Sequence, residues 1–193
     1  MTERPERTFF ERPVTAVAPE LLGMVLACGD RAGRIVEVEA YGGAEDPASH
    51  GHRGRTPRNE VMFGPPGHLY VYFSYGMHWC ANVVCESDGR CGAVLVRALA
   101  PLRGVEDMWV DRPKARRERD LCSGPAKLTS ALGIVGDHNG VDLLAPNSPV
   151  TVHQRDSDPP DLASSARIGI SLARERPWRW YVPGDANVSR PPR

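Results

Sequence analysis

Apolar and polar residues alternate along several short stretches of the chain, a pattern typical of β-strands that bury one face. The clearest stretch covers residues 34–41, which we predict to form a strand. Because successive side chains of a strand point to opposite faces, its core face would carry Val36, Val38 and Ala40. The opposite face would carry Glu37, Glu39 and Tyr41.

The same pattern predicts further strands, at residues 68–74, 78–85, 92–99, 150–153, 167–171 and 178–182. The first two of these are separated only by Tyr75, Gly76 and Met77, so we expect a β-hairpin with Tyr75 at or beside its tip. Neighbouring strands joined by short turns indicate an antiparallel sheet with helices packed around it, an α+β fold.

Short helices are predicted between the strands. Residues 18–26 have proline in what would be the first turn, and residues 125–133 have Ser123 as an N-cap candidate and a C-terminal glycine. Residues 102–121 are expected to be mainly helical, with an interruption at Pro113. Residues 42–67 and 156–162 are expected to be loops, and a loop as long as the first is uncommon unless it is functional or disordered.

Length and composition indicate one ordinary globular domain, spanning residues 1–193. About residues 1–10 and 185–193 are expected to be flexible. The five cysteines are odd in number and include no Cys-x-x-Cys motif, which argues against a disulfide scaffold or a zinc ribbon. We find no signal-peptide pattern and no apolar run of membrane-spanning length, so a cytoplasmic location is expected.

The 24 basic and 24 acidic residues balance in number, but the basic residues are unevenly distributed along the chain. Arginines cluster at Arg53, Arg55 and Arg58, and basic residues cluster again within residues 112–119. Such clusters either solubilise exposed loops or form a basic face that contacts phosphates.

Two charged residues lie within apolar strands and are candidates for chemistry. Glu39 either faces solvent or lines a pocket, where it could act as general base on a water molecule. Arg97 is flanked by apolar residues, and arginine is rarely buried without an acid. It therefore either lies at the surface or pairs with Glu39, which would keep that carboxylate ionised.

Histidines and tyrosines supply further candidates. His50 and His52 have a spacing that can serve a metal, but no third ligand follows at a recognisable distance, so a packed or hydrogen-bonded loop histidine is the better interpretation. Tyr70 and Tyr72 are explained equally well by β-propensity. An aromatic residue at the hairpin tip, as expected for Tyr75, resembles the wedges that some proteins push between base pairs.

Several blocks of sequence together resemble the alkyladenine (3-methyladenine) DNA glycosylase family of the mammalian type. The similarity extends from about residue 21 to residue 182, and the order of the blocks makes it specific. The blocks are Glu-Val-Glu-Ala-Tyr-Gly-Gly-Ala-Glu-Asp-Pro-Ala-Ser-His (37–50), Arg-Thr-Pro-Arg-Asn (55–59), Gly-His-Leu-Tyr-Val-Tyr-Phe-Ser-Tyr-Gly-Met (67–77), Val-Leu-Val-Arg-Ala-Leu (94–99) and Leu-Cys-Ser-Gly-Pro-Ala-Lys-Leu (121–128).

The resemblance implies a fold and a set of residue roles. The fold would be a single domain on a curved, open-barrel-like antiparallel sheet, with a protruding hairpin that enters the DNA minor groove. Glu39 would be the general base and Arg97 its partner in holding the water. The base pocket would contain Tyr41, His50, Tyr72, Asn82 and Ile168. Within it, a backbone carbonyl near Ile168 would be the third ligand of the water. Tyr75, with Met77, would intercalate, and Arg53, Arg55 and Arg58 would contact the backbone.

The implied function is monofunctional excision of alkylated or deaminated purines from double-stranded DNA by base flipping. Substrates would be of the 3-methyladenine, 7-methylguanine, hypoxanthine and ethenoadenine type. The protein would be a monomer of the compact bacterial kind, without cofactor, metal, membrane contact or Schiff-base lyase step. A non-catalytic module that binds damaged nucleic acid and a metal hydrolase using His50 and His52 are the alternatives. His52 itself has no role that the resemblance implies.

Overall fold

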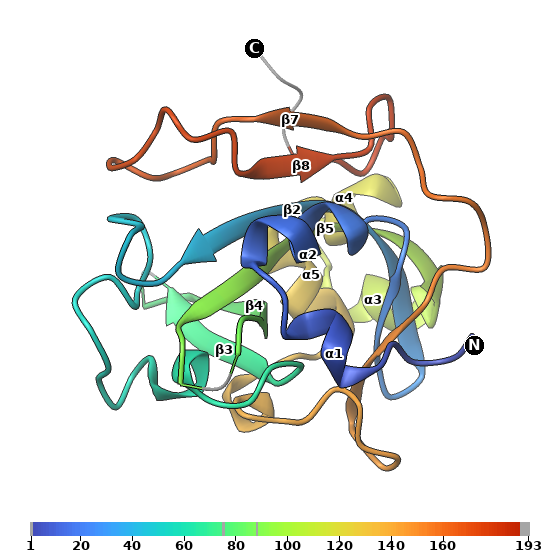
Figure 1. Cartoon of the computed structure of the whole chain (residues 1–193). Coiled ribbons are helices and arrows are strands. Elements are labelled where there is room, and N and C mark those ends of the chain that lie inside the picture. The colour runs from blue at the N-terminus through green and yellow to red at the C-terminus, as the bar shows by residue number, and fades with distance from the viewer. Residues whose placement is uncertain (1, 75, 88, 190–193) are drawn as a thin grey trace.

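The computed structural model describes residues 2–74, 76–87 and 89–189 (Figure 1). Within these ranges, eight strands form one antiparallel sheet. The main path of the sheet runs β3-β4-β5-β2-β1-β6, and β8 pairs with β2 and with β7. The strands are β1 (Val25–Cys28), β2 (Arg31–Gly42), β3 (Leu69–Ser74), β4 (His78–Val84), β5 (Gly92–Arg103), β6 (Val150–His153), β7 (Ala163–Ser165) and β8 (Arg179–Tyr181).

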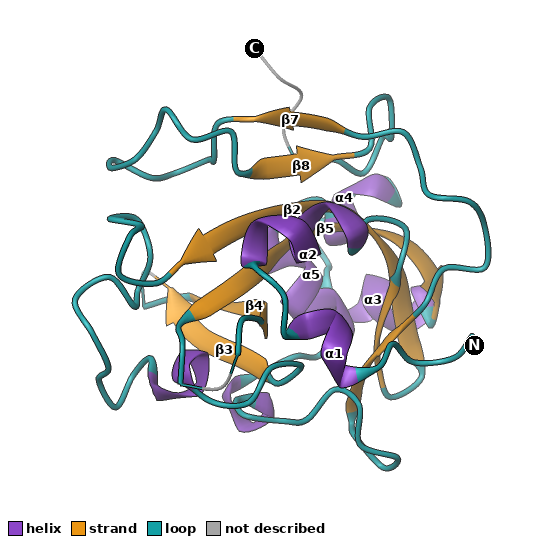
Figure 2. Ribbon diagram, viewed as in Figure 1, coloured by secondary structure: helices purple, strands orange, loops and turns teal. Residues whose placement is uncertain are grey.

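Short helices lie against this sheet, which curls into a half-barrel (Figure 2). This arrangement confirms the predicted α+β fold of a single domain with a curved antiparallel sheet. The helices are α1 (Arg7–Phe10), α2 (Val14–Glu20), α3 (Val105–Asp111), α4 (Arg119–Cys122) and α5 (Pro125–Leu132), with two 3-10 turns, η1 (Glu60–Phe63) and η2 (Gly136–His138).

The centre of the sheet is the long pair β2 and β5, and its pairing is interrupted by bulges. The register is regular from residue 38 to residue 42 but shifts between Ile35 and Glu37 and again between Glu37 and Val38. The first shift leaves Val36 as an extra residue on β2, and the second leaves Arg97 as an extra residue on β5. Bulges redirect side chains, which explains the one error in the predicted core face of β2. Val38 and Ala40 join the main core as expected, but Val36 packs in a separate small cluster with Ala98 and Ala100.

The predicted hairpin is confirmed as β3 and β4. Asn82 lies directly across from Tyr70, as expected, and Leu95 of β5 lies on its other side. The prediction for Tyr75 falls on a residue outside the described ranges. Met77, in the turn before β4, is 68% exposed.

Three predicted elements differ from the structure. Residues 18–26 were expected to be one helix, but α2 ends at Glu20 and Val25 begins strand β1, which pairs with β2 and β6. Residues 102–121 are only partly helical, because β5 continues to Arg103 and an irregular segment separates α3 from α4. Residues 167–171 form no strand and instead continue the loop after β7.

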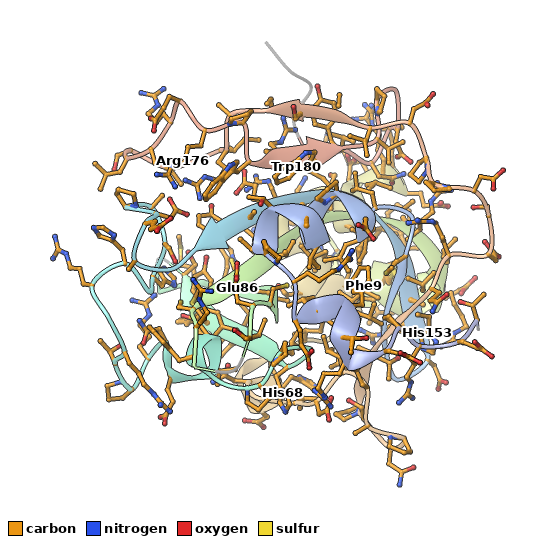
Figure 3. All side chains as sticks on the ribbon, viewed as in Figure 1. Phe9, His68, Glu86, His153, Arg176 and Trp180 are labelled. Carbon is orange, nitrogen blue, oxygen red and sulfur yellow. The ribbon has the colours of Figure 1, made fainter. Side chains whose placement is uncertain are left out.

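The main core fills the space between the curled sheet and the helices. Phe10, Leu21 and Leu99 are among its fully buried side chains. Trp180 lies on the side of β8 toward α2 and packs against this core (Figure 3). The burial of Phe10 and the hydrogen bonds of Ser189 to Glu37 tie both ends of the described chain to the domain. The expected flexibility of the termini stays a prediction.

The five cysteines are free, and four of them are buried. Burial raises the pKa of each thiol, to about 11 for Cys91 and about 12 for Cys122. Within the described ranges, no helix combines the length and the apolar character needed to cross a membrane.

Candidate active site

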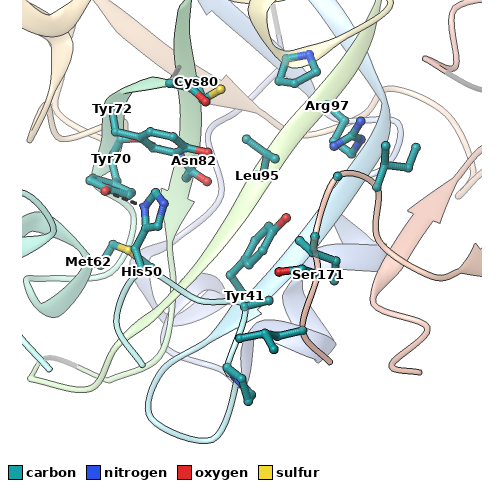
Figure 4. Close-up of a pocket in the computed structure, with 18 of the residues that line it drawn as sticks. Tyr41, His50, Met62, Tyr70, Tyr72, Cys80, Asn82, Leu95, Arg97 and Ser171 are labelled. Atoms are coloured by element: carbon teal, nitrogen blue, oxygen red, sulfur yellow. Dashed lines mark hydrogen bonds between the residues drawn. The ribbon is translucent and has the colours of Figure 1, made fainter. Parts of the chain in front are cut away.

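A cavity of about 580 Å³ opens beside the C-terminal half of β2 (Figure 4). Its volume falls in the usual range for small-molecule sites. The walls come from β2, the long loop after it, the β3–β4 hairpin, β5 and the loop after β7. The side chains that matter most for its chemistry are Tyr41, His50, Tyr72, Asn82, Leu95 and Arg97.

Glu39 is fully buried behind the lining residues Tyr41, Arg97 and Ile168, and it is held by two hydrogen-bond donors and one ion pair. The Tyr41 hydroxyl donates to Glu39 Oε2 over 2.8 Å, and the Ile168 amide donates to Oε1 over 2.7 Å. Arg97 Nη1 lies 3.1 Å from Oε2. An ionised carboxylate only accepts hydrogen bonds, so two donors and a neighbouring guanidinium suit its ionised form. The predicted pairing of Glu39 with Arg97 is confirmed.

Arg97 also contacts a second carboxylate. Its Nε donates to Glu37 Oε1 over 2.9 Å, so one guanidinium joins Glu37 and Glu39. Burial opposes the charged form of Arg97, but the two carboxylates outweigh burial and raise its pKa above the ordinary value. Burial likewise opposes ionisation of Glu37, but Arg97, the Ser189 amide and Arg179 lower its pKa. Both groups therefore stay charged at neutral pH.

Aromatic rings form two opposite sides of the cavity. Figure 4 shows Tyr41 on one side and His50 with Tyr72 on the other, with Leu95 and Asn82 between them. The rings of His50 and Tyr72 meet edge to face, with centroids 4.5 Å apart. Burial is the main cause of the raised pKa of Tyr41 and Tyr72, and the Glu39 carboxylate adds to it for Tyr41. The slot between these rings therefore has uncharged, electron-rich walls.

A hydrogen bond with Tyr70 fixes the ring of His50. Its Nδ1 lies 3.0 Å from the Tyr70 hydroxyl, and burial, followed by the nearby Arg58 cation, lowers its pKa. His50 is therefore neutral at pH 7. Asn59 stabilises the loop that carries His50, because its side-chain amide donates to the carbonyl oxygens of His50 and Gly54.

Asn82 lies at the floor of the slot, where it is 4% exposed. Its amide nitrogen donates to the Tyr70 carbonyl oxygen over 3.0 Å, which fixes the orientation of the carboxamide. Ile168 was expected to contribute a carbonyl oxygen, but the contact that the structure shows is its amide N–H to Glu39. The role of that carbonyl stays a prediction.

The loops on the two sides of Tyr41 are joined by an ion pair that sequence reasoning missed. Arg167 binds Asp46 through two bonds of 2.6 and 2.8 Å, and both side chains are fully buried. Arg167 also donates to the Ala40 carbonyl and lies 4.7 Å from the centroid of the Tyr41 ring. This pair therefore fixes the Tyr41 wall and the adjacent Ile168 amide.

The predicted DNA-contacting arginines are spread over the rim and the surface. Arg53 and Arg55 are exposed, and Arg55 pairs with Glu60. Arg58 lines the cavity, with its guanidinium 5.8 Å from the Tyr72 ring centroid. His52 turns away to the Ala44 carbonyl, 2.7 Å from its Nδ1. No group of three potential metal ligands occurs among the described residues.

Sequence reasoning also missed Arg179 and Ser189, which surround Glu37. Both residues lie near the end of the chain, and no sequence pattern links them to Glu37. Glu37 could have been found, because it shares the face and the spacing of Glu39 on β2.

The site combines a buried carboxylate, an adjacent guanidinium and a flat aromatic slot. A carboxylate of this kind can deprotonate a water molecule and stabilise positive charge on a neighbouring sugar, while the slot accepts a planar group.

Comparison with known sequences identifies the class to which this site belongs. Residues 8–186 match the methylpurine-DNA glycosylase family, and the chain belongs to this family. Its members are hydrolases of N-glycosyl bonds that act on DNA.

Close relatives carry names that agree with the family. A protein of Burkholderia lata named "Putative 3-methyladenine DNA glycosylase" is 58% identical over 187 residues, covering 96% of this chain and 90% of the relative. Proteins of the same name from Rhodopseudomonas palustris and Nitrobacter winogradskyi are 52% and 51% identical, and each covers 96% of this chain. The matching regions span 90% of the Rhodopseudomonas protein and 86% of the Nitrobacter protein.

Proposed function

We propose that this protein is a monofunctional glycosylase that hydrolyses the N-glycosidic bond of damaged purines in duplex DNA. The observation that carries the proposal is the buried Glu39 carboxylate, held by Tyr41, Arg97 and the Ile168 amide beside an aromatic slot. Glu39 is the general base for the attacking water, and Arg97 holds Glu39 and the water in place. The bond breaks as positive charge develops on the sugar, which the carboxylate stabilises.

The damaged base is bound in the slot between Tyr41 and the pair His50 and Tyr72. A base within a duplex is out of reach, so it must leave the stack at a cost of a few kcal/mol. Alkylated purines such as 3-methyladenine and 7-methylguanine carry positive charge, which favours contact with electron-rich ring faces. The bulk of Asn82 at the slot floor disfavours the exocyclic amine of normal guanine. Hypoxanthine and ethenoadenine are proposed substrates of the same slot, and a neutral base such as hypoxanthine needs acid assistance at the purine.

The hairpin supplies the wedge that replaces the extruded nucleotide. Tyr75 intercalates in the minor groove, supported by Met77, whose large exposure leaves it available for contact with DNA. The described residues that line the cavity include no lysine, which supports hydrolysis without a Schiff-base lyase step. The protein acts as a monomer in the cytoplasm, bound to duplex DNA.

A panel of lesions in duplex DNA tests the function directly. Under single-turnover conditions, excess protein should release 3-methyladenine, 7-methylguanine, hypoxanthine or ethenoadenine and leave an abasic site that breaks only after alkali. Unmodified duplex is the control. Tight binding of these duplexes without release of any base would show a binding module instead. Strand breaks without alkali would contradict the absence of lyase chemistry.

Binding to undamaged duplex should weaken as salt rises, because arginine contacts to phosphates release counterions. We expect the slope of log K against log salt to decrease by about 1 for each phosphate contact removed by Arg53→Ala, Arg55→Ala or Arg58→Ala. Fluorescence anisotropy at several salt concentrations measures the binding constant and hence the slope. Arg12→Ala is the matched control, because Arg12 pairs with Glu20 and is not part of the cavity. A slope that none of the three variants changes would exclude these arginines as phosphate contacts.

A further inference from the structure

We propose that Glu37 is a positioning residue for the reaction: through Arg97 it sets the geometry of Glu39, and Ser189 near the chain end completes this arrangement. The inference rests on the proposed function, because it assigns a role within the same site. Glu37 binds Arg97, and Arg97 in turn contacts Glu39, so Glu37 acts on the reacting groups through Arg97.

The contacts of Glu37 account for both of its carboxylate oxygens. Oε1 accepts from Arg97 Nε over 2.9 Å, from Arg179 Nε over 2.7 Å and from the Ser189 hydroxyl over 2.9 Å. Oε2 accepts from the Ser189 amide over 2.6 Å. Four donors from three distant parts of the chain thus converge on one fully buried carboxylate.

The bulges of the central sheet create this convergence. Arg97 is the extra residue on β5 at the step from Glu37 to Val38, so its side chain meets two acids that lie two residues apart on β2. In a regular ladder, Arg97 would lie directly opposite one residue of β2 and would reach another acid only diagonally. The bulge therefore allows one guanidinium to bridge Glu37 and Glu39.

The division of the guanidinium between two acids matters for the chemistry. Arg97 uses Nε for Glu37 and Nη1 for Glu39, so it contacts Glu39 through one nitrogen. Arginine free to turn would bind a carboxylate through two parallel bonds. Such a pair would occupy Glu39 and displace the water that it must deprotonate. Because Glu37 binds Nε, Arg97 does not form a two-bond pair with the catalytic carboxylate.

Stability alone is a weak reason for this cluster. Taking charges out of water costs several kcal/mol per ion, and well-packed apolar residues often give equal or greater stability. Glu37, Glu39, Arg97 and Arg179 are all buried on the same part of the sheet. A network with this desolvation cost is better explained by the orientation that it imposes on Arg97.

Ser189 extends the arrangement to the end of the described chain. Its amide and hydroxyl bind Glu37, and Arg97 Nη2 lies 3.5 Å from its hydroxyl. Val188, its neighbour, packs in a small apolar cluster with Val36 and Ala98. Ser189 therefore covers one side of Glu37, and the packing of Val188 holds Ser189 in place.

Single-turnover excision by Glu37→Gln tests the proposal once wild-type protein has been shown to release a damaged purine. Glutamine keeps the shape but cannot accept four donors, so Arg97 can turn. We expect a fall of about 10²-fold in the rate at saturating protein, as for a small misplacement of a reacting group. The dissociation constant for lesion DNA should change by less than about threefold, within the range of a minor contact. Glu20→Gln, at an exposed ion pair, is the control and should keep the wild-type rate.

A double-mutant cycle separates positioning from a general loss of structure. The Arg97→Lys variant lacks the forked guanidinium that Glu37 orients. Adding Glu37→Gln to this variant should therefore lower the remaining rate by less than about threefold, because the effects of coupled residues are not additive. An equal factor in both backgrounds, or a wild-type rate for Glu37→Gln alone, would overturn the proposal.

Ser189→Ala provides a second variant if Glu37→Gln does not fold. It removes one hydroxyl from a half-buried position and leaves the amide bond to Glu37, so folding should be retained. We expect a rate about tenfold lower, which corresponds to about 1.4 kcal/mol, with rescue by Ser189→Thr. Unchanged excision by Ser189→Ala would remove Ser189 from the arrangement. Wild-type protein without excision would instead defeat the proposed function.

Discussion

Excision by Glu39→Gln should be about 10³-fold slower than by the wild type, within the range that general base catalysis contributes. Glutamine has nearly the same volume as glutamate, so the slot and the wedge should be unchanged. Its carbonyl oxygen can still accept from the Ile168 amide, but the side chain can no longer take a proton from water. Single-turnover release of hypoxanthine or 7-methylguanine from duplex DNA measures the effect.

Binding of the same DNA should be retained by Glu39→Gln, because the stacking and backbone contacts do not involve the carboxylate. Glu45→Gln, in the exposed loop after β2, is the matched control and should excise at the wild-type rate. Near-normal excision by Glu39→Gln would show that another group activates the water. Loss of both binding and melting temperature would show that Glu39 is chiefly structural.

Removal of the Asp46 carboxylate should produce the largest loss of stability. Asp46→Ala leaves the Arg167 guanidinium buried without its acid, and breaking a buried pair costs about 3–5 kcal/mol. Both side chains are fully buried, so water cannot replace the lost partner without local opening of the loops. The midpoint of urea unfolding, measured by circular dichroism, should fall while the slope stays constant.

The exposed pair Arg55 and Glu60 offers a matched control for this experiment. Its side chains are 58% and 59% exposed, so Glu60→Ala should change the free energy of unfolding by less than about 1 kcal/mol. A loss in Asp46→Ala as small as that of the control would mean that water already reaches Arg167. Because Arg167 precedes Ile168, excision by Asp46→Ala should also slow, even under conditions where the protein is folded.

The parts of the site that were predictable from sequence are those on regular strands. Alternation gave the face shared by Glu39 and Tyr41, and hairpin geometry gave the pairing of Asn82 with Tyr70. The pairing of Arg97 with Glu39 followed from the cost of leaving an arginine unpaired among apolar residues. Each of these inferences depends on local pattern or on a single strong energetic rule.

The parts that were missed depend on contacts between distant segments. Val25 and Leu26 fit an apolar helix equally well, and only pairing with β2 and β6 makes them a strand. Bulges at Val36 and Arg97 have no marker such as glycine in this sequence. Asp46 and Arg167 are 121 residues apart, and no local pattern links them.

The chemistry of the cysteines has a consequence for the survival of the protein among electrophiles. Thiolate, not thiol, is the nucleophile, and all five cysteines have a raised pKa. At neutral pH the five cysteines therefore carry very little thiolate, even Cys80, which lines the cavity. In a member of the methylpurine-DNA glycosylase family, this keeps the cysteines largely in the less nucleophilic thiol form.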